Sequence, residues 1–201
     1  MSRATILGAA ALVALLLAGC TTAEPAPTEP GTTAEATSSP SPSPVESSPA
    51  PVVIAPERPA EMDDDGYQGA EAAAKYFLSL DDHMMKTGDT AEWEAMSHEE
   101  CSTCTKRLEQ ARTIAENGDE FHGGEMTVEI LHTYEQDEPT GIWPIDISVE
   151  VEPVTITNQE GDEVFSEDAV VAEQRIEVTH QRDRWVIVNV VGAEHLDRDD
   201  A

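Results

Sequence analysis

Hydrophobic residues change their spacing partway along the chain, and this change most constrains what the chain can fold into. Between residues 67 and 115 apolar side chains recur every three or four positions, which is the period of an amphipathic helix. Between residues 126 and 191 they alternate with polar side chains, which is the period of a half-buried strand. Helices followed by strands predict an α+β domain, and the missing strand–helix–strand alternation argues against a doubly wound sheet.

Three helical segments are expected in the first half of this domain. The first covers residues 67–86 and ends at Thr87-Gly88-Asp89, because glycine commonly terminates a helix. A short helical turn follows, with Thr90 as its N-cap. The third segment begins at Ser97, since Ser97 and Glu100 have the spacing of a capping box, and it ends at Asn117-Gly118.

Four strands are expected in the second half, at residues 126–134, 143–151, 170–178 and 185–191. Pro153 interrupts the second strand and indicates a bulge or an edge position. The last strand is apolar on both faces, so we expect it to be central in the sheet and covered. The predicted architecture is a curved four-stranded antiparallel sheet with the helices packed on one face.

The N-terminus has the pattern of an export signal. Arg3 precedes an apolar run from Ile6 to Leu17, which is too short to span a bilayer. The run ends in Leu17-Ala18-Gly19-Cys20, which resembles the bacterial lipoprotein box. We therefore expect residues 1–19 to be removed and Cys20 to carry a lipid that anchors the protein at the outer face of the cytoplasmic membrane. The alternative is an ordinary signal peptide followed by a cysteine that occurs by chance.

Residues 20–62 form a segment of different composition. The stretch from Thr21 to Met62 holds 10 of the 13 prolines and no aromatic residue, so it cannot bury enough apolar surface to offset its ordering entropy. A disordered linker is predicted, either a passive spacer or a glycosylated stalk. The remaining residues, 63–201, form the single domain and its acidic C-terminal tail.

Acidic residues dominate the folded part of the chain. The sequence has 41 Asp and Glu against 11 Lys and Arg, a formal net charge of −30, and only 6 of the acids precede Asp63. Such a domain repels polyanions, which excludes a nucleic-acid-binding function. The charge indicates a domain kept hydrated and soluble outside the cell, or a surface that attracts a cationic partner. We expect a monomer.

Several of these features together resemble an actinobacterial lipoprotein family that carries domain of unknown function 6318. They are the lipoprotein box, the Pro/Ser/Thr linker, Arg58-Pro59, Tyr76-Phe77, Thr87-Gly88-Asp89-Thr90 and Cys101-Ser102-Thr103-Cys104. The order of helices and strands looks more loosely like the cone-shaped nuclear transport factor 2-like superfamily. The family is uncharacterised, so the resemblance implies no activity and no catalytic residues.

Cys101 and Cys104 are the most informative pair of residues. Thiols oxidise outside the cytoplasm, and with Cys20 lipidated two cysteines remain, so a structural disulfide is predicted. One alternative is a redox Cys-x-x-Cys, which the neighbouring glutamates disfavour. Another is a zinc site that also uses His98 and His122.

Other candidate sites carry weaker signals. The acidic run Glu61–Gly66 resembles a calcium loop, but position twelve is Ala72 instead of glutamate. His132, Tyr134, His180 and Asn189 lie on apolar strand faces and could line a pocket, either as a ligand site or as an acid–base pair of an enzyme. We expect no catalysis and no cofactor, and a module that binds an envelope protein or a small ligand.

Overall fold

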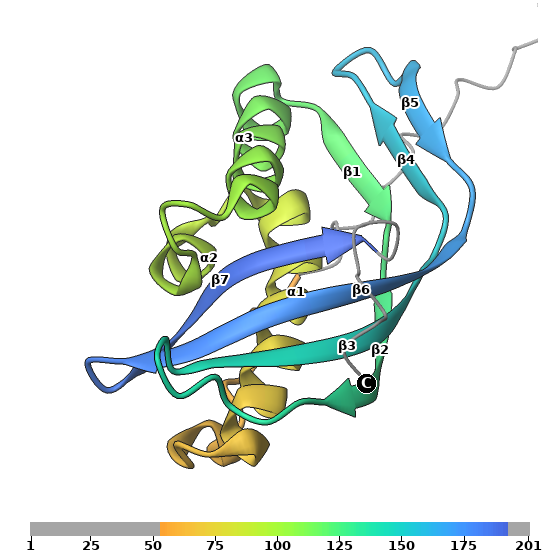
Figure 1. The fold of residues 1–201 in the computed structure, drawn as a ribbon. Helices are drawn as coiled ribbons and strands as arrows, with labels where there is room; N and C mark the ends of the chain where they lie inside the picture. Colours follow the sequence, from red (N-terminus) through yellow and green to blue (C-terminus); the bar gives the residue numbers. More distant parts are fainter. Residues whose placement is uncertain (1–52, 193–201) are drawn as a thin grey trace, which may run out of the picture. The chain divides into compact units, whose positions relative to one another are not determined.

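The computed structural model describes residues 53–192, in which helices precede strands (Figure 1). The helical elements are η1 (Ala60–Asp63), α1 (Tyr67–Thr87), α2 (Ala91–Met96) and α3 (Ser102–Asn117). The strands are β1 (Glu120–Gly123), β2 (Met126–Thr133), β3 (Ile142–Val151), β4 (Val154–Thr157), β5 (Glu163–Glu167), β6 (Val170–Gln181) and β7 (Arg184–Gly192). The predicted α+β class and the order of the two halves are confirmed.

The predicted signal peptide, Cys20, most of the predicted linker and the C-terminal tail lie outside the described residues. The last residues assigned to the linker are described, and they belong to the fold. Met62 in η1 is buried, and its carbonyl accepts hydrogen bonds from Trp185 Nε1 and Arg58 Nη2, both at 3.0 Å. The ordered fold therefore begins ahead of Asp63.

Helix α1 forms as its pattern predicts, and it provides the centre of the core. The side chains expected on its apolar stripe are all buried: Ala70, Ala73, Ala74, Phe77, Leu80 and Met84. Gly88 ends the helix with a φ of 73°, and its N–H donates to the Met84 carbonyl at 2.9 Å. Because this left-handed backbone favours glycine, the predicted helix end is confirmed.

The starts of the next two helices differ from the prediction. Thr90 occupies the N-cap position of α2, but its hydroxyl donates to Glu94 Oε1 and does not cap the backbone. The predicted capping box is wrong, because α3 begins at Ser102 with Cys101 as its N-cap. The intervening backbone bonds to the sheet instead, where the N–H of His98 donates to the Ile187 carbonyl at 2.9 Å.

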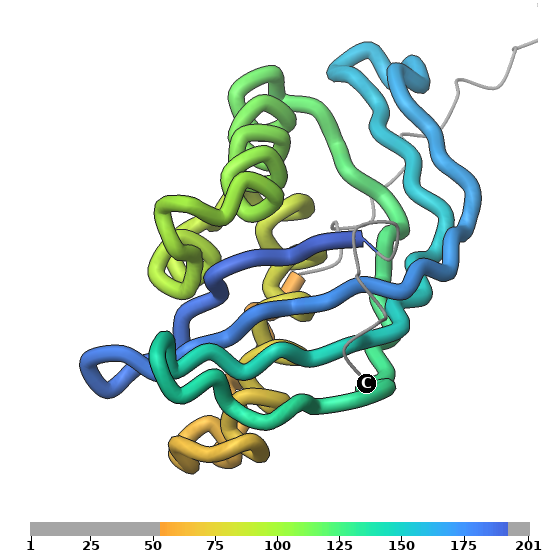
Figure 2. Tube along the Cα trace, in the orientation of Figure 1, coloured from red at the N-terminus to blue at the C-terminus, as the bar shows by residue number. Residues whose placement is uncertain are grey.

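The predicted antiparallel sheet of four strands is present, in the order β2-β3-β6-β7. A second sheet, in the order β1-β4-β5, was not predicted. Each of its strands adjoins a strand of the first sheet along the chain, with two residues between them, and Figure 2 shows the trace bending at these links. Pro153 is therefore the point where the strand pair β3–β4 passes from one sheet to the other.

Close backbone packing holds this bend. The N–H of Gly124 donates to the Pro153 carbonyl at 3.3 Å, and the N–H of Glu152 donates to the Glu125 carbonyl at 3.0 Å. Gly123 has a φ of 73°, and a Cβ there would lie 1.9 Å from the Pro153 oxygen. The bend therefore requires glycine at this position.

The last strand is covered, as predicted, but it is not central. β7 forms the edge of the four-stranded sheet, which contradicts the expectation from its two apolar faces. The segment before α3 and the start of α3 lie along this edge. The hydroxyl of Thr103 donates to the Val190 carbonyl at 2.9 Å. These elements therefore cover the edge of β7 and bond its backbone, as a neighbouring strand would.

Candidate functional site

Two β-bulges decide the orientation of three of the four predicted pocket residues. In β2 the register passes from Ile130 opposite Ile147 to His132 opposite Asp146, so Leu131 is an extra residue. A bulge of one residue exchanges the two faces of a strand. His132 and Tyr134 consequently lie on the sheet face that points away from α1, which corrects the expected position on the apolar face.

A second bulge has the same effect in β7. Val178 lies opposite Ile187, and Glu177 lies opposite Asn189, so Val188 is the extra residue there. Asn189 is thereby turned to the outer face, where its Oδ1 accepts a hydrogen bond from the Val190 N–H at 3.1 Å. The Asn189 side chain thus bonds the backbone of its own strand.

The four predicted residues therefore do not share a pocket. His180 packs on Trp185, with ring centroids 4.8 Å apart. His132 and Tyr134 do meet, in an edge-on contact with centroids 4.4 Å apart, and they line an open groove of about 510 Å³ beside Tyr67.

A charged cluster lies beneath Tyr134 on the outer face. The tyrosine hydroxyl donates to Asp146 Oδ2 at 3.0 Å, and Arg175 donates to both oxygens of the same carboxylate at 2.7 and 3.0 Å. The Arg175 guanidinium also lies 4.6 Å from the centroid of the tyrosine ring. We call Tyr134, Asp146 and Arg175 the outer cluster.

Contacts within the outer cluster lower the pKa of Asp146 and raise the pKa of Tyr134. Partial burial of Asp146 would raise its pKa, but hydrogen bonds from Arg175 and Tyr134 outweigh burial and lower it. The hydrogen bond to the Asp146 carboxylate raises the pKa of Tyr134 in turn. Asp146 is therefore an ionised acceptor at neutral pH.

A second concave site lies between α1, α3 and the four-stranded sheet, with a volume of about 290 Å³. We call it the helix pocket. Its apolar lining consists of Phe77, Leu78, Trp93, Cys104, Met126 and Val190, and its polar lining consists of Asp81, Thr103, Lys106, Arg107, Gln110 and Gln174. None of the four predicted pocket residues belongs to it.

An ion pair forms part of the pocket wall. Arg107 Nε and Nη2 donate to the two oxygens of Asp81, both at 2.6 Å, and Nη1 donates to Gln110 Oε1 at 2.8 Å. The side chain of Asp81 is 2% exposed and that of Arg107 is 26% exposed. Burial alone would lower the pKa of Arg107, but the hydrogen-bonded Asp81 carboxylate outweighs it and raises the pKa.

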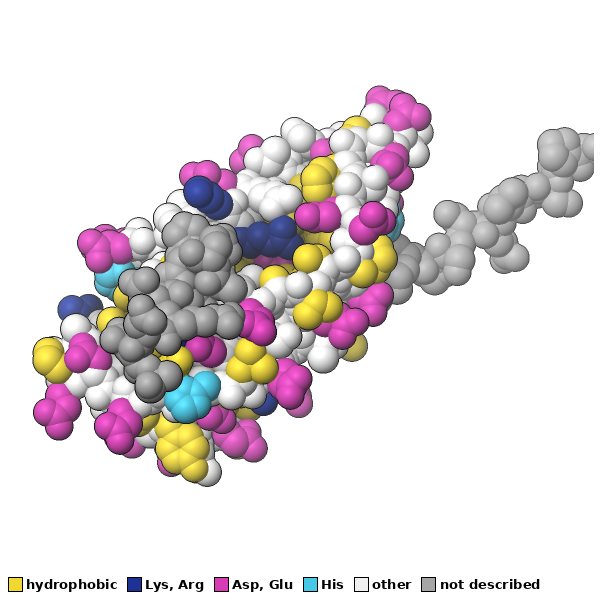
Figure 3. Space-filling model, turned by 45° about the vertical axis from the view of Figure 1, so that its right-hand side comes forward, with side chains coloured by type: hydrophobic (Ala, Val, Ile, Leu, Met, Phe, Trp, Pro, Cys, Tyr) yellow, Lys and Arg dark blue, Asp and Glu magenta, His cyan; other side chains and the backbone are white. Residues whose placement is uncertain are grey.

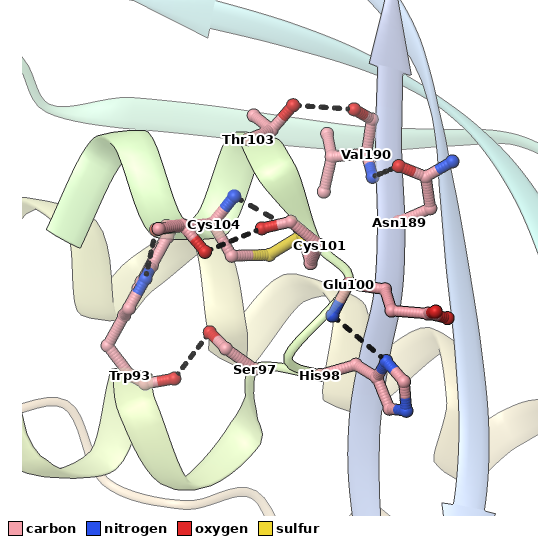
Figure 4. Close-up of a disulfide and its surroundings, with 10 residues drawn as sticks. Trp93, Ser97, His98, Glu100, Cys101, Thr103, Cys104, Asn189 and Val190 are labelled. Atoms are coloured by element: carbon pink, nitrogen blue, oxygen red, sulfur yellow. Dashed lines mark hydrogen bonds between the residues drawn. A yellow bond between two sulfur atoms is a disulfide. The ribbon is translucent and has the colours of Figure 1, made fainter.

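The disulfide between Cys101 and Cys104 is present at the start of α3, beside β7 (Figure 4). Cys101 Sγ also accepts a hydrogen bond from the Cys104 N–H at 3.2 Å, and the Cys104 carbonyl accepts one from Trp93 Nε1 at 3.1 Å. Both cysteines are buried, with exposed fractions of 0% and 1%. The bond therefore fixes the first turn of α3, which directly precedes Lys106 and Arg107.

This burial bears on the alternatives for the cysteine pair. Thiol–disulfide exchange requires an attacking thiolate to reach a sulfur atom, and these sulfurs are enclosed by the fold. Within residues 53–192, no group of three or more His, Cys, Asp or Glu side chains is arranged to hold a metal ion. The redox, zinc and calcium hypotheses thus gain no support from the described part of the chain.

The helix pocket was not predicted from the sequence, although a signal was present. Asp81 follows Phe77 by four residues and precedes Met84 by three, so it is a carboxylate on the apolar stripe of α1. Arg107 likewise lies three residues after Cys104, on the buried side of α3. A charged residue of each sign on two apolar stripes indicates a buried ion pair between the helices.

Acidic side chains are spread over the surface that surrounds these sites. Figure 3 shows many of them on one face, with few basic side chains between. The acidic charge that the sequence predicts for the folded part is thus visible on this face.

No helix in the described residues is long and apolar enough to cross a membrane.

Comparisons with known proteins place the chain in a family and in a fold. A family model described as "Family of unknown function (DUF6318)" matches residues 45–191. No curated protein matches the chain. The crystal structure of the intermembrane space region of the chloroplast protein ARC6 is similar, with a TM-score of 0.50 and 10% identity over 63% of this chain and 95% of that chain.

Two further solved structures have lower scores. A periplasmic fragment of TraM has a TM-score of 0.43 and 11% identity, over 61% of this chain and 96% of that chain. A putative calcium/calmodulin-dependent protein kinase II association domain from Xanthomonas campestris has a TM-score of 0.35 and 12% identity, over 70% of this chain and 96% of that chain. At these identities the likeness concerns the fold alone.

Proposed function

We propose that this chain, which belongs to the DUF6318 family of unknown function, is a lipid-anchored binding module of the cell envelope. In this proposal the domain is held outside the cytoplasmic membrane by a lipid on Cys20. The helix pocket holds a small and largely apolar ligand, and the domain performs no chemistry on it.

The observation that carries the binding function is the composition of the helix pocket. Half of its lining side chains are apolar or aromatic, and the polar ones come from a few positions on α1, α3 and β6. Ligand sites generally combine such apolar walls with a small number of polar groups that orient the ligand. Trp93 and Phe77 stack with centroids 3.9 Å apart, so the aromatic part of the wall is preformed.

The ion pair in the pocket favours binding over catalysis. A general base must lie within hydrogen-bond reach of the proton that it takes from the substrate. The side chain of Asp81 is instead 2% exposed, and both of its oxygens accept a hydrogen bond from Arg107. Asp81 is thus a structural carboxylate, and the lining contains no histidine.

The anchoring part of the proposal rests on the sequence, because Cys20 follows an apolar run and small residues. Cys20→Ala should release the protein from the membrane fraction into the soluble fraction, measured by fractionation and immunoblotting. Ser47→Ala, a change in the predicted linker, is the matched control and should leave the distribution unchanged. Membrane association that survives Cys20→Ala would contradict the anchor.

The binding part is tested with N-phenyl-1-naphthylamine, a neutral apolar probe that fluoresces in apolar sites. The full chain carrying Cys20→Ala is used, so that no membrane or detergent competes for the probe. We expect saturable binding that Gln174→Trp reduces at least about tenfold, because an indole at this lining position would fill the pocket. Ser148→Trp, on the outer face of β3, is the control. Equal binding by both variants would contradict the helix pocket as the site.

A further inference from the structure

We infer that the ligand of the helix pocket is an anionic amphiphile, that is, an apolar body with one carboxylate, sulfonate or phosphate group. The inference rests on the proposed binding function and adds the chemistry of the ligand. It is carried by the hydrogen-bond donors and the charge that α3 places at the pocket.

The fold leaves several hydrogen-bond donors available at the pocket. A guanidinium has five N–H groups, and the described contacts of Arg107 use three of them, two to Asp81 and one to Gln110. Gln110 accepts from Arg107 through its oxygen, so its NH₂ group is also available. None of the ion pairs within residues 53–192 includes the ammonium of Lys106. The polar side of the pocket therefore offers donors.

The carboxylate on the same side is already paired. Both oxygens of Asp81 receive a hydrogen bond from Arg107, and its side chain is 2% exposed. A ligand group that accepts several hydrogen bonds fits this arrangement better than one that donates them. Charge-assisted bonds to a carboxylate, sulfonate or phosphate are the strongest of this kind.

The charge of the pocket lining differs in sign from the charge of the whole chain. The pocket lining contains Asp81, Lys106 and Arg107, so its formal charge is +1 in a chain whose net charge is −30. The field of the whole protein repels an anion, so an anionic ligand would have to be recognised by these nearby groups.

The aromatic and the cationic side chains of the pocket come from different helices. Phe77 and Trp93 come from α1 and α2, whereas Lys106 and Arg107 come from one stretch of α3. The cationic donors are thus grouped on one helix. The volume of the pocket corresponds to roughly ten water molecules, which suits a ligand of moderate size with a single charged end.

The test compares two probes that share one ring system. N-phenyl-1-naphthylamine is neutral, and 1-anilinonaphthalene-8-sulfonate carries a sulfonate on the same skeleton. Each is titrated against the full chain carrying Cys20→Ala, alone and with Lys106→Gln. Lys75→Gln is the matched control, because Lys75 is an exposed helical lysine outside the pocket and the change in net charge is identical.

We expect Lys106→Gln to weaken binding of the sulfonate probe about fivefold to tenfold and to leave the neutral probe within about twofold. Lys75→Gln should change neither probe more than about twofold, and Gln174→Trp should block both. If both probes bind and Lys106→Gln matches Lys75→Gln, the anionic ligand is wrong while the binding function stands. If neither probe binds in a way that Gln174→Trp blocks, the binding function itself is wrong.

Discussion

The helix pocket and the outer cluster each contain an aspartate that receives two hydrogen bonds from an arginine. Asp81 and Arg107 lie between helices with the carboxylate 2% exposed, whereas Asp146 and Arg175 lie on the outer sheet face at 19% and 21% exposure. Each guanidinium also lies near an aromatic ring, 5.9 Å from the Phe121 centroid in the first pair and 4.6 Å from the Tyr134 centroid in the second.

The two arginines bond their aspartates in a similar way, so we expect burial to decide how much stability is lost when either pair is broken. Water can solvate a carboxylate on the outer face when its arginine is removed, but it cannot easily reach Asp81. A buried charge without a partner costs several kcal/mol, and an exposed pair contributes about 1 kcal/mol or less. The following four predictions test this difference.

The largest effect is expected for Arg107→Met, which leaves the Asp81 carboxylate buried without its partner. The free energy of unfolding, measured by urea denaturation, should fall by about 3–5 kcal/mol. The double variant Asp81→Leu with Arg107→Met should recover most of this loss, because it removes both charges. A double variant no more stable than Arg107→Met would contradict the explanation.

The disulfide should have the next largest effect and should act on the same region. Replacing Cys101 and Cys104 with alanine releases the first turn of α3, and the entropy of so short a loop corresponds to about 2 kcal/mol. A double-mutant cycle measures its coupling to each arginine. We expect coupling to Arg107→Met and none to Arg175→Met, since only Arg107 lies on α3. Equal coupling to both arginines would contradict a specific effect of the disulfide on the region around Arg107.

A smaller effect is expected for Arg175→Met in the outer cluster. Asp146 retains the Tyr134 hydroxyl as a donor and is partly exposed to water. The free energy of unfolding should fall by about 1 kcal/mol or less. Arg112→Met, which breaks an exposed pair with Glu94, should behave similarly. A loss as large as that of Arg107→Met would remove the distinction between the two regions.

The smallest effect is a dependence on pH at the outer cluster. Burial opposes the shift, but hydrogen bonds from Arg175 and Tyr134 lower the pKa of Asp146, so the folded state binds its proton less readily than the unfolded state. Its contribution is fully present above the unfolded pKa of about 3.9 and is lost as pH falls through the folded value. The difference in stability between wild type and Asp146→Asn should therefore shrink as pH falls below about 4. A constant difference would contradict the lowered pKa.

Much of the fold could be predicted because it follows from local periodicity. The stripe of α1 and the glycine at its end agree with the structure, and so do the four strands of the larger sheet. The smaller sheet was missed because β1 and β5 are short, and every residue of β5 is exposed. These strands form because they continue β2 and β6 across the bend. No hydrophobic pattern within the short strands themselves predicts them.

The site was predicted less well, for a related reason. The disulfide follows from two cysteines three residues apart, so local chemistry sufficed. His132, Tyr134 and Asn189 were expected on an apolar face because strand periodicity assumes an unbroken ladder. One extra residue in β2 and one in β7 reverse that assignment. A bulge depends on the partner strand, so alternation along one strand does not reveal it.

The sequence by itself determined the helix–strand order, the ends of the first and third helices, the cysteine pair and the acidic surface. These properties depend on neighbours along the chain or on composition. The tertiary structure decided that Asp81 meets Arg107 from 26 positions away, and that β7 is an edge covered by α3. It also decided that the pocket lies between the helices and the four-stranded sheet. Those outcomes depend on which distant segments pack together, because a buried charge and an edge strand acquire their partners only when the chain has folded.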